Sequence, residues 1–188
     1  LQNLTSSTPP RNTDVRFDAG VAVTTGVFNP LLGRNAGDAL TDADSNVAVG
    51  VNSLGTDTLG SRSTAVGLSA LQTQNFTTAT DSHNTAVGNQ AGFAVTTGTK
   101  GTFIGSEAGI AVNTGTENTC VGFQAGVNLA SGSNNTYIGS LAGFNTTNGG
   151  NNVVVGHDCA LAGQSTTNAI GMGFEVTTQS NNNFTFGN

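Results

Sequence analysis

Charged residues are scarce in this chain of 188 residues and long apolar runs are absent, and each of these shortages excludes a class of protein. Only 9% of the residues are charged, against about 25% in an average soluble domain. Five basic residues beside 11 acidic ones are too few for phosphate binding, so we exclude nucleic acid as a partner. No apolar run approaches the roughly 20 residues of a membrane-spanning helix, and we therefore expect no membrane span.

Glycine, threonine and asparagine are abundant instead. Glycine supplies 27 residues, and all three prolines fall within the first 30 positions. Many β-branched and turn-forming residues with little charge favour a chain of short strands. The length is enough for one domain of ordinary size or for two small ones.

An internal repeat dominates the sequence, and its clearest copy reads Asn-Thr-Ala-Val-Gly-x-x-Ala-Gly from Asn84 to Gly92. The first glycine of each copy is its anchor. Anchors follow one another at 17 residues, with one step of 21 after Gly67 and steps of 15 and 16 at the C-terminal end. The predicted anchors are Gly33, Gly50, Gly67, Gly88, Gly105, Gly122, Gly139, Gly156, Gly171 and Gly187.

The period decides the architecture, because helical repeats need about 33 residues or more. Seventeen residues hold two short strands and two turns, which is one coil of a β-solenoid. A second glycine column ten residues after the anchors predicts glycine at both corners, where tight turns need positive φ: Gly60, Gly98, Gly115, Gly132 and Gly149. We predict an all-β solenoid of about ten coils, a rod about 48 Å long at ~4.8 Å per coil.

Alternation along each strand predicts which side chains face the interior. The residues directly before the anchors form an unbroken apolar column, which we predict to point inward: Leu32, Val49, Val66, Val87, Ile104, Val121, Ile138, Val155, Ile170 and Phe186. Alanines three residues after the anchors, such as Ala91 and Ala108, fit a corner too tight for larger side chains.

The residues two before the anchors should then point outward, yet they are apolar along nearly the whole rod. They are Ala48, Ala65, Ala86, Phe103, Cys120, Tyr137, Val154 and Ala169. A strand that is apolar on both faces is buried on both faces, and an exposed strip of this length is a liability. We therefore predict that this column is the seam of an oligomer.

The repeat resembles the head repeats of YadA-like trimeric autotransporter adhesins, in which a similar Asn-Ser-Val-Ala-Ile-Gly segment recurs. The resemblance covers roughly residues 29–187 and implies a left-handed parallel β-roll assembled as a homotrimer. The 17-residue form, with Asn-Thr in front and Ala-Gly behind, is similar to repeats of left-handed β-rolls in phage and viral fibre or decoration proteins. Such rolls are scaffolds shared by different surface proteins, so the resemblance is less specific for function.

Candidate catalytic and metal-binding residues are few. His157, Asp158 and Cys159 are adjacent, but Cys159 takes the place of a corner alanine, and His83 lies in another coil. Asp38, Asp42 and Asp44 cluster after the first coil, where we favour a solvated loop over a calcium site. We expect no enzyme activity, no metal and no cofactor.

The two cysteines should stay unpaired, because Cys120 and Cys159 lie two coils, or about 10 Å, apart along the axis. Regular threonine ladders on β-solenoids bind ice, and Thr64, Thr85, Thr102, Thr119 and Thr136 form such a ladder. Alternation places these threonines on the same side as the predicted inward column, which argues against ice binding.

Two segments interrupt the repeat. Residues 1–28 are predicted to be an extended N-terminal arm, with Pro9, Pro10, Arg11 and Arg16 as candidate docking residues; a frayed terminus is the alternative. The β-roll domain spans 29–188 and carries a four-residue insertion within 72–81, which must bulge from the rod. Its candidate contact loop is Gln74, Asn75, Phe76, Thr77 and Thr78.

These patterns favour a non-enzymatic, homotrimeric structural protein on a virion surface, either a capsid decoration spike or a tail-fibre segment. Because the 188 residues contain no coiled-coil stalk and no membrane-anchor segment, we place the head of a bacterial trimeric adhesin, on a bacterial cell surface, second. Besides its own copies, the expected partners are a capsid or tail protein, bound through the N-terminal arm, and a host-surface receptor.

Overall fold

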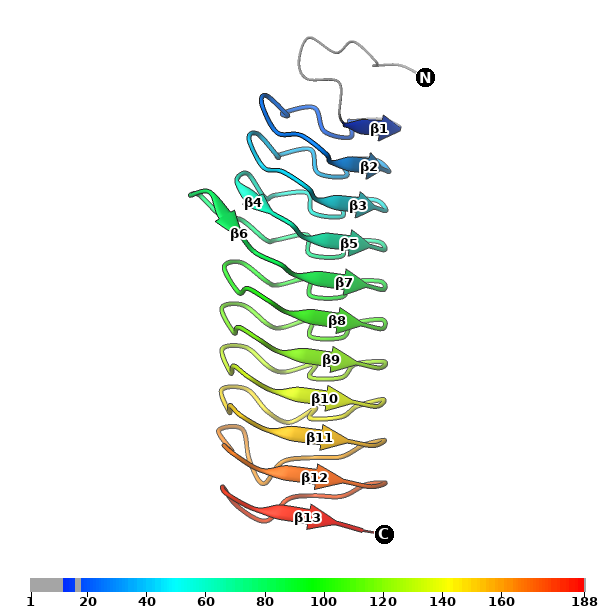
Figure 1. Ribbon diagram of the computed structural model, residues 1–188. Helices are drawn as coiled ribbons and strands as arrows, with labels where there is room; N and C mark the ends of the chain where they lie inside the picture. Colours follow the sequence, from blue (N-terminus) through cyan, green and yellow to red (C-terminus); the bar gives the residue numbers. More distant parts are fainter. Residues whose placement is uncertain (1–11, 16–17, 188) are drawn as a thin grey trace.

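The computed structural model describes residues 12–15 and 18–187, and for Asp14 and Val15 only their backbone. The described chain coils into a straight rod in which short strands stack along the axis (Figure 1). All pairings within the main sheet are parallel, and the sheet has eleven strands. The prediction of an all-β, parallel β-solenoid is confirmed.

The strands of the main sheet are three residues long and follow one another in chain order. They are β1 (Thr13–Val15), β2 (Pro30–Leu32), β3 (Val47–Val49), β5 (Thr64–Val66), β7 (Thr85–Val87), β8 (Thr102–Ile104), β9 (Thr119–Val121), β10 (Thr136–Ile138), β11 (Val153–Val155), β12 (Ile170–Met172) and β13 (Phe184–Phe186). A second sheet pairs β4 (Gly60–Ser61) with β6 (Thr80–Asp81) at the insertion, where the chain projects sideways from the rod (Figure 1).

The solenoid begins earlier than the repeat predicts. Strand β1 lies inside the segment predicted as an arm, and it pairs in parallel with β2, Thr13 opposite Pro30. The amide side chain of Asn12 also donates to the carbonyl oxygen of Gly26, at 2.8 Å. Part of residues 1–28 therefore belongs to the rod; residues 1–11 lie outside the described chain.

The anchor glycines occupy one corner of each coil with positive φ, as predicted. Gly105 has φ +130°, and a Cβ there would lie 2.5 Å from the carbonyl oxygen of Gly122 in the next coil. A side chain is thus excluded both by the dihedral angle and by the stacked backbone. The second glycine column differs: Gly98 has no positive φ, and a Cβ there would instead meet the carbonyl oxygen of Gly115 at 2.5 Å.

Of the two anchors predicted at the C-terminal end, Gly187 stands at a corner with φ +138°, but Gly171 is the wrong residue. Gly171 is buried opposite Val154 within the sheet. Gly173 stands at the corner with φ +140°, seventeen residues after Gly156. The sequence Ala-Ile-Gly imitates the repeat two residues early, whereas the constant period identifies the correct corner.

The predicted directions of the strand side chains are reversed. Residues two before the anchors point into the coil and form the interior column, and each member of the predicted seam is at most 1% exposed: Ala48, Ala65, Ala86, Phe103, Cys120, Tyr137, Val154 and Ala169. Ala169 is buried as well, but it lies two residues before Gly171, and Gly171 is the residue that continues the interior column opposite Val154. Residues directly before the anchors point outward, with Val87 38% and Ile104 40% exposed.

Small side chains line the interior because the coil is thin. The corner alanines are fully buried, as predicted, and Val95, Val112 and Leu129 close the interior from the opposite side. The large ring of Phe103 fits only where glycine makes room: a Cβ on Gly101 or Gly109 would lie 2.5 Å or 2.3 Å from its ring atoms.

Buried asparagines join successive coils at the start of many strands. Asn118 donates its side-chain amide to the carbonyl oxygen of Gly132, at 2.7 Å, and accepts from the backbone N–H of Asn135, at 3.0 Å. Asn135 repeats the pattern with Gly149 and Asn152. Each asparagine satisfies buried backbone groups of the next coil, which fixes the coils at equal spacing.

Candidate functional site

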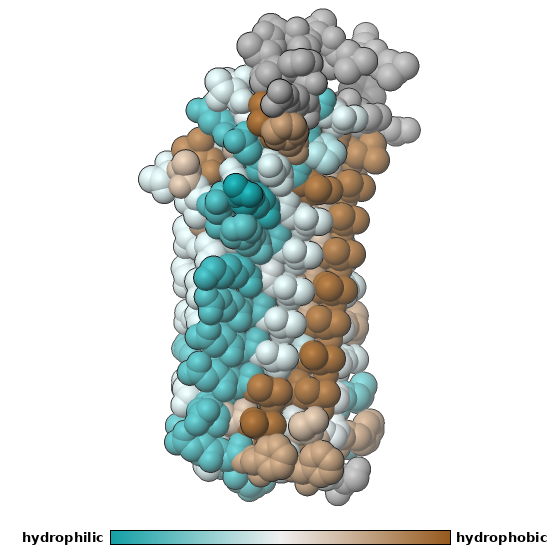
Figure 2. All heavy atoms as spheres, in the orientation of Figure 1, coloured by the Kyte–Doolittle hydropathy of each residue, from teal (hydrophilic) through white to brown (hydrophobic). Residues whose placement is uncertain are grey.

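The most distinctive surface of the rod is the outward face of the main sheet. One apolar side chain per coil projects from this face and forms the outward apolar column: Leu32, Val49, Val66, Val87, Ile104, Val121, Ile138, Val155, Met172 and Phe186. Its exposure reaches 41% at Ile138 and 74% at Phe186. Figure 2 shows it as a continuous hydrophobic strip along the rod.

A second column lies beside it, two residues earlier on each strand. Five consecutive strands place threonine there, and we call these residues the threonine block: Thr64, Thr85, Thr102, Thr119 and Thr136. Apolar residues stand at the same position on both sides of the block, Val47 before it and Val153 and Ile170 after it. All five threonines are half-buried and face outward, so the prediction that they face the interior is wrong.

Within the described residues, the hydroxyl groups of the threonine block have no hydrogen-bond partner. None of them forms a hydrogen bond to another residue of the described chain, whereas threonines elsewhere bridge neighbouring coils. Thr41 Oγ1, for example, donates to the carbonyl oxygen of Thr58 at 3.1 Å, and Thr73 Oγ1 donates to that of Phe93 at 2.7 Å. The block therefore presents free donors and acceptors next to the outward apolar column.

This face carries no charged side chain at either column among the described residues. The ion pairs lie at other corners, between Arg62 and Asp81 at 2.9 Å and between Lys100 and Glu117 at 2.8 Å, and all four side chains are exposed. Exposed pairs of this kind contribute little stability. Charge is kept away from the flat face, so another uncharged surface can approach it without electrostatic repulsion.

The predicted contact loop is only partly exposed. Gln74 is fully buried and Phe76 is 6% exposed, while Asn75, Thr77 and Thr78 are exposed. Gln74 lies inside because its side-chain amide binds the carboxylate of Asp57, Nε2 to Oδ2 at 2.5 Å. Asp57 also accepts the backbone N–H of Phe76, at 3.0 Å, so a buried polar network anchors the base of the insertion. Spacing alone gives no signal for this network.

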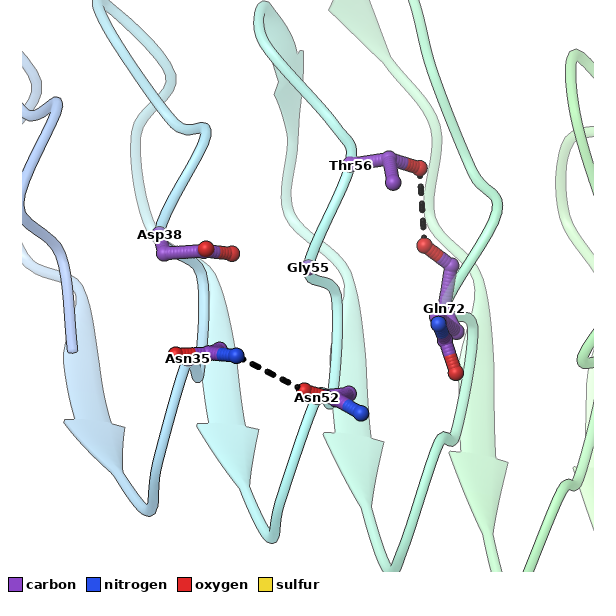
Figure 3. A pocket seen from close by; sticks show the side chains of 6 residues that line it. All are labelled: Asn35, Asp38, Asn52, Gly55, Thr56 and Gln72. Atoms are coloured by element: carbon purple, nitrogen blue, oxygen red, sulfur yellow. Dashed lines mark hydrogen bonds between the residues drawn. The ribbon is translucent and has the colours of Figure 1, made fainter. Parts of the chain in front are cut away.

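A shallow hollow of about 200 Å³ lies near the N-terminal end of another face. Asp38, Gly55 and Gln72 line the hollow, and each occupies the position in its coil that Phe93 occupies in a later coil. Hydrogen bonds join neighbouring coils at the hollow, between Asn35 and Asn52 and between Thr56 and Gln72 (Figure 3). Burial raises the pKa of Asp38. The hollow forms because these three coils lack the large apolar side chain that Phe93 supplies at the same position.

The other acidic residues of the predicted cluster bind the preceding coil. Asp42 accepts from the hydroxyls of Thr24 and Thr25, which lowers the pKa of Asp42, and Asp44 accepts the backbone N–H of Val27 at 2.7 Å. Within the described ranges, no three His, Cys, Asp or Glu side chains are grouped to hold a metal ion.

Both cysteines are buried free thiols. Cys120 lies in the interior column rather than at a seam, and burial raises the pKa of Cys120 to about 12. Cys159 occupies the corner-alanine position as predicted. His157 stacks on Phe174, with ring centroids 5.4 Å apart.

The candidate docking residues Pro9, Pro10, Arg11 and Arg16 lie outside the described residues. The part of the chain that is described contains no helix long and apolar enough to cross a membrane. No family model, no curated protein and no solved structure matches this chain.

Proposed function

We propose that this protein is a non-catalytic structural rod that assembles as a homotrimer by burying the outward face of its main sheet. The observation that carries the proposal is the outward apolar column, which continues from Leu32 to Phe186 with no polar residue. The seam is thus moved by one residue from the sequence-based prediction. The number of copies and the left-handed sense of the coil are predictions that rest on the family resemblance.

Further copies of the same chain fit this strip better than an unrelated surface does. Coils spaced by ~4.8 Å in one copy match coils at the same spacing in another along a strip about 48 Å long. With two columns about 7 Å apart, the strip covers roughly 340 Å², an area within the range of the largest apolar patch on typical monomers, which is often functional. Each copy has a net charge of -6, and a seam on this face brings no like charges into direct contact.

The mass of the native assembly tests this proposal. We expect three times the chain mass of 18.7 kDa by native mass spectrometry. The triple variant Val87→Asp, Ile104→Asp and Ile138→Asp should fold but remain monomeric, because a seam would bury unpaired charge.

A matched control places three aspartates at exposed polar corners of neighbouring coils: Thr97→Asp, Thr114→Asp and Ser131→Asp. This control should keep the wild-type mass. A wild-type protein that is monomeric at micromolar concentration, or an outward triple variant that stays trimeric, contradicts the proposed seam.

We propose further that the assembled rod projects from a virion surface, as a decoration spike or a tail-fibre segment. The attachment to a capsid or tail protein, predicted for residues 1–28, is now assigned to residues 1–11, because strand β1 and the residues that follow it belong to the rod. This part is supported by the resemblance of the 17-residue repeat to viral fibre and decoration proteins. Labelling the source particle with antibodies against the rod tests it. Labelling of a bacterial cell surface instead would favour the adhesin head.

Ice binding is a second candidate, favoured by the outward direction of the threonine block. A flat lattice of free hydroxyl and methyl groups at a constant spacing holds water in ordered positions. This function needs an uncovered face, so it predicts a monomer with thermal hysteresis activity that Thr102→Leu and Thr119→Leu abolish. A trimeric protein without thermal hysteresis excludes it.

A further inference from the structure

The two columns of the outward face differ in one respect that matters for assembly. The outward apolar column is nearly uniform, so a copy shifted by a whole coil along the axis would find the same kind of neighbour. Uniform strands specify register weakly. The outward apolar column can thus hold copies together without fixing their relative height.

The threonine column is not uniform. Threonine occupies five consecutive coils, and apolar residues occupy the same position before Thr64 and after Thr136. The five hydroxyl groups are outward and free of hydrogen bonds within the described chain. A hydroxyl group both donates and accepts, so threonines at equal height in neighbouring copies can bind one another.

We propose that the threonine block sets the axial register of the copies, so that the trimer closes with every coil at equal height. This inference rests on the proposed homotrimer. A shift by one coil would place Thr64 of one copy against Val47 of the next, and Thr136 of the next against Val153 of the first. Buried hydroxyl groups would then lack partners, which is costly, as for a single polar position that fixes coiled-coil register.

Closure gives this register a consequence. Equal heights produce a closed ring of identical interfaces, whereas staggered copies form interfaces that differ from one another and leave apolar residues uncovered at the ends. The outward apolar column thus supplies association, and the threonine block selects the closed form over the staggered forms.

The only methionine of the chain, Met172, gives a direct readout because it belongs to the outward apolar column. In a closed trimer the three Met172 side chains are equivalent. With ¹³C-methyl methionine labelling, we expect one methyl resonance from the wild-type trimer. Staggered copies place Met172 opposite different residues, including Phe186, and give several resonances.

Two variants of opposite polarity remove the pattern. The first changes all five threonines of the block to valine. The second places threonine at every position of the column through Pro30→Thr, Val47→Thr, Val153→Thr, Ile170→Thr and Phe184→Thr, so that the block no longer has ends within the rod. Both should remain folded by circular dichroism and should show several Met172 resonances of comparable intensity. The control Ile104→Val with Ile138→Val keeps the pattern and should show one resonance.

The outcomes separate this inference from the proposed function. If both pattern variants keep a single resonance in trimers of wild-type mass, or if the wild-type trimer shows several, the threonine block does not set the register. A wild-type chain that is monomeric by mass overturns the homotrimer and this inference together.

Discussion

Neighbouring residues on one strand are both large and largely hydrophobic, yet they lie in opposite environments in this rod. On β8, Phe103 is 1% exposed inside the coil, and Ile104 is 40% exposed on the outward face. On β10, Tyr137 and Ile138 repeat the contrast. Hydropathy therefore does not tell the interior of a thin coil from its outer face; the space available inside does. The interior accepts alanine readily and a large ring only beside glycine.

The largest expected effect is the difference between a charge placed on the interior side of β11 and one placed on its outward side. Val154→Asp buries a carboxylate in an apolar interior with no cationic partner, and we expect a loss of at least about 4 kcal/mol. Circular dichroism should show an unfolded chain. Val155→Asp, one residue along, should keep the β-sheet spectrum and lose only the assembly; equal damage from both variants would contradict the assigned directions.

Truncation on β8 sharpens the same contrast. Phe103→Ala leaves a cavity inside the coil and should cost about 3–5 kcal/mol. Ile104→Ala removes atoms that are already partly in water and should cost less than about 1.5 kcal/mol in the chain itself. Urea unfolding at one fixed protein concentration, in the monomeric background Val87→Asp, measures both.

Restoring the repeat at Gly101 should be harmful, although asparagine holds this position in several other coils. A Cβ there would lie 2.5 Å from the ring of Phe103, and overpacking of this kind costs about 1–3 kcal/mol. The double variant Gly101→Asn with Phe103→Ala recreates the Asn-x-Ala pattern of Asn84 and Ala86. Denaturation should show a double variant more stable than the sum of the single effects by about 1 kcal/mol or more; additive losses would refute the coupling.

The smallest effect depends on pH and again follows from an interior position. Burial raises the pKa of Cys120 to about 12, whereas an unfolded thiol titrates near 8.5. The unfolded chain therefore loses this proton first, and stability falls as pH rises above about 8.5, by up to about 2 kcal/mol at pH 10. Cys120→Ala should flatten this part of the stability curve; an unchanged slope would show that Cys120 does not cause it.

The period predicts the architecture because stacked backbones demand it. Gly105 and its equivalents must recur wherever the chain turns beneath another coil, and the corner alanines must stay small. The predicted direction of the strand side chains is wrong because the residues one and two before the anchors are both apolar. Side-chain size favours the column directly before the anchors as the interior one, whereas the thin coil has room mainly for the smaller side chains of the other column. The threonines indicate the correct direction. Alternation puts Thr85 and Val87 on one side of the strand and Ala86 on the other, and a column that contains polar threonines is the one expected to face outward.

The insertion shows a second limit of prediction. Its position follows from the 21-residue step, but the burial of Gln74 and Phe76 does not. Asp57 and Gln74 replace apolar residues of the interior and bind each other there. From the sequence, each of these polar residues is expected to be exposed, because burying either one alone would be costly. Their mutual hydrogen bond, which makes the burial possible, is visible only in the structure.

The asparagine bridges between coils join each coil only to its neighbours. Where the interior side chains are small and apolar, a 17-residue unit that keeps its glycine corner and its asparagine can therefore be duplicated or deleted without altering the units beyond it. Each such event changes the length of the rod by one step of ~4.8 Å. Duplication of a repeat within the gene would thus change the length of the rod in fixed increments, set by the spacing of its hydrogen-bonded strands.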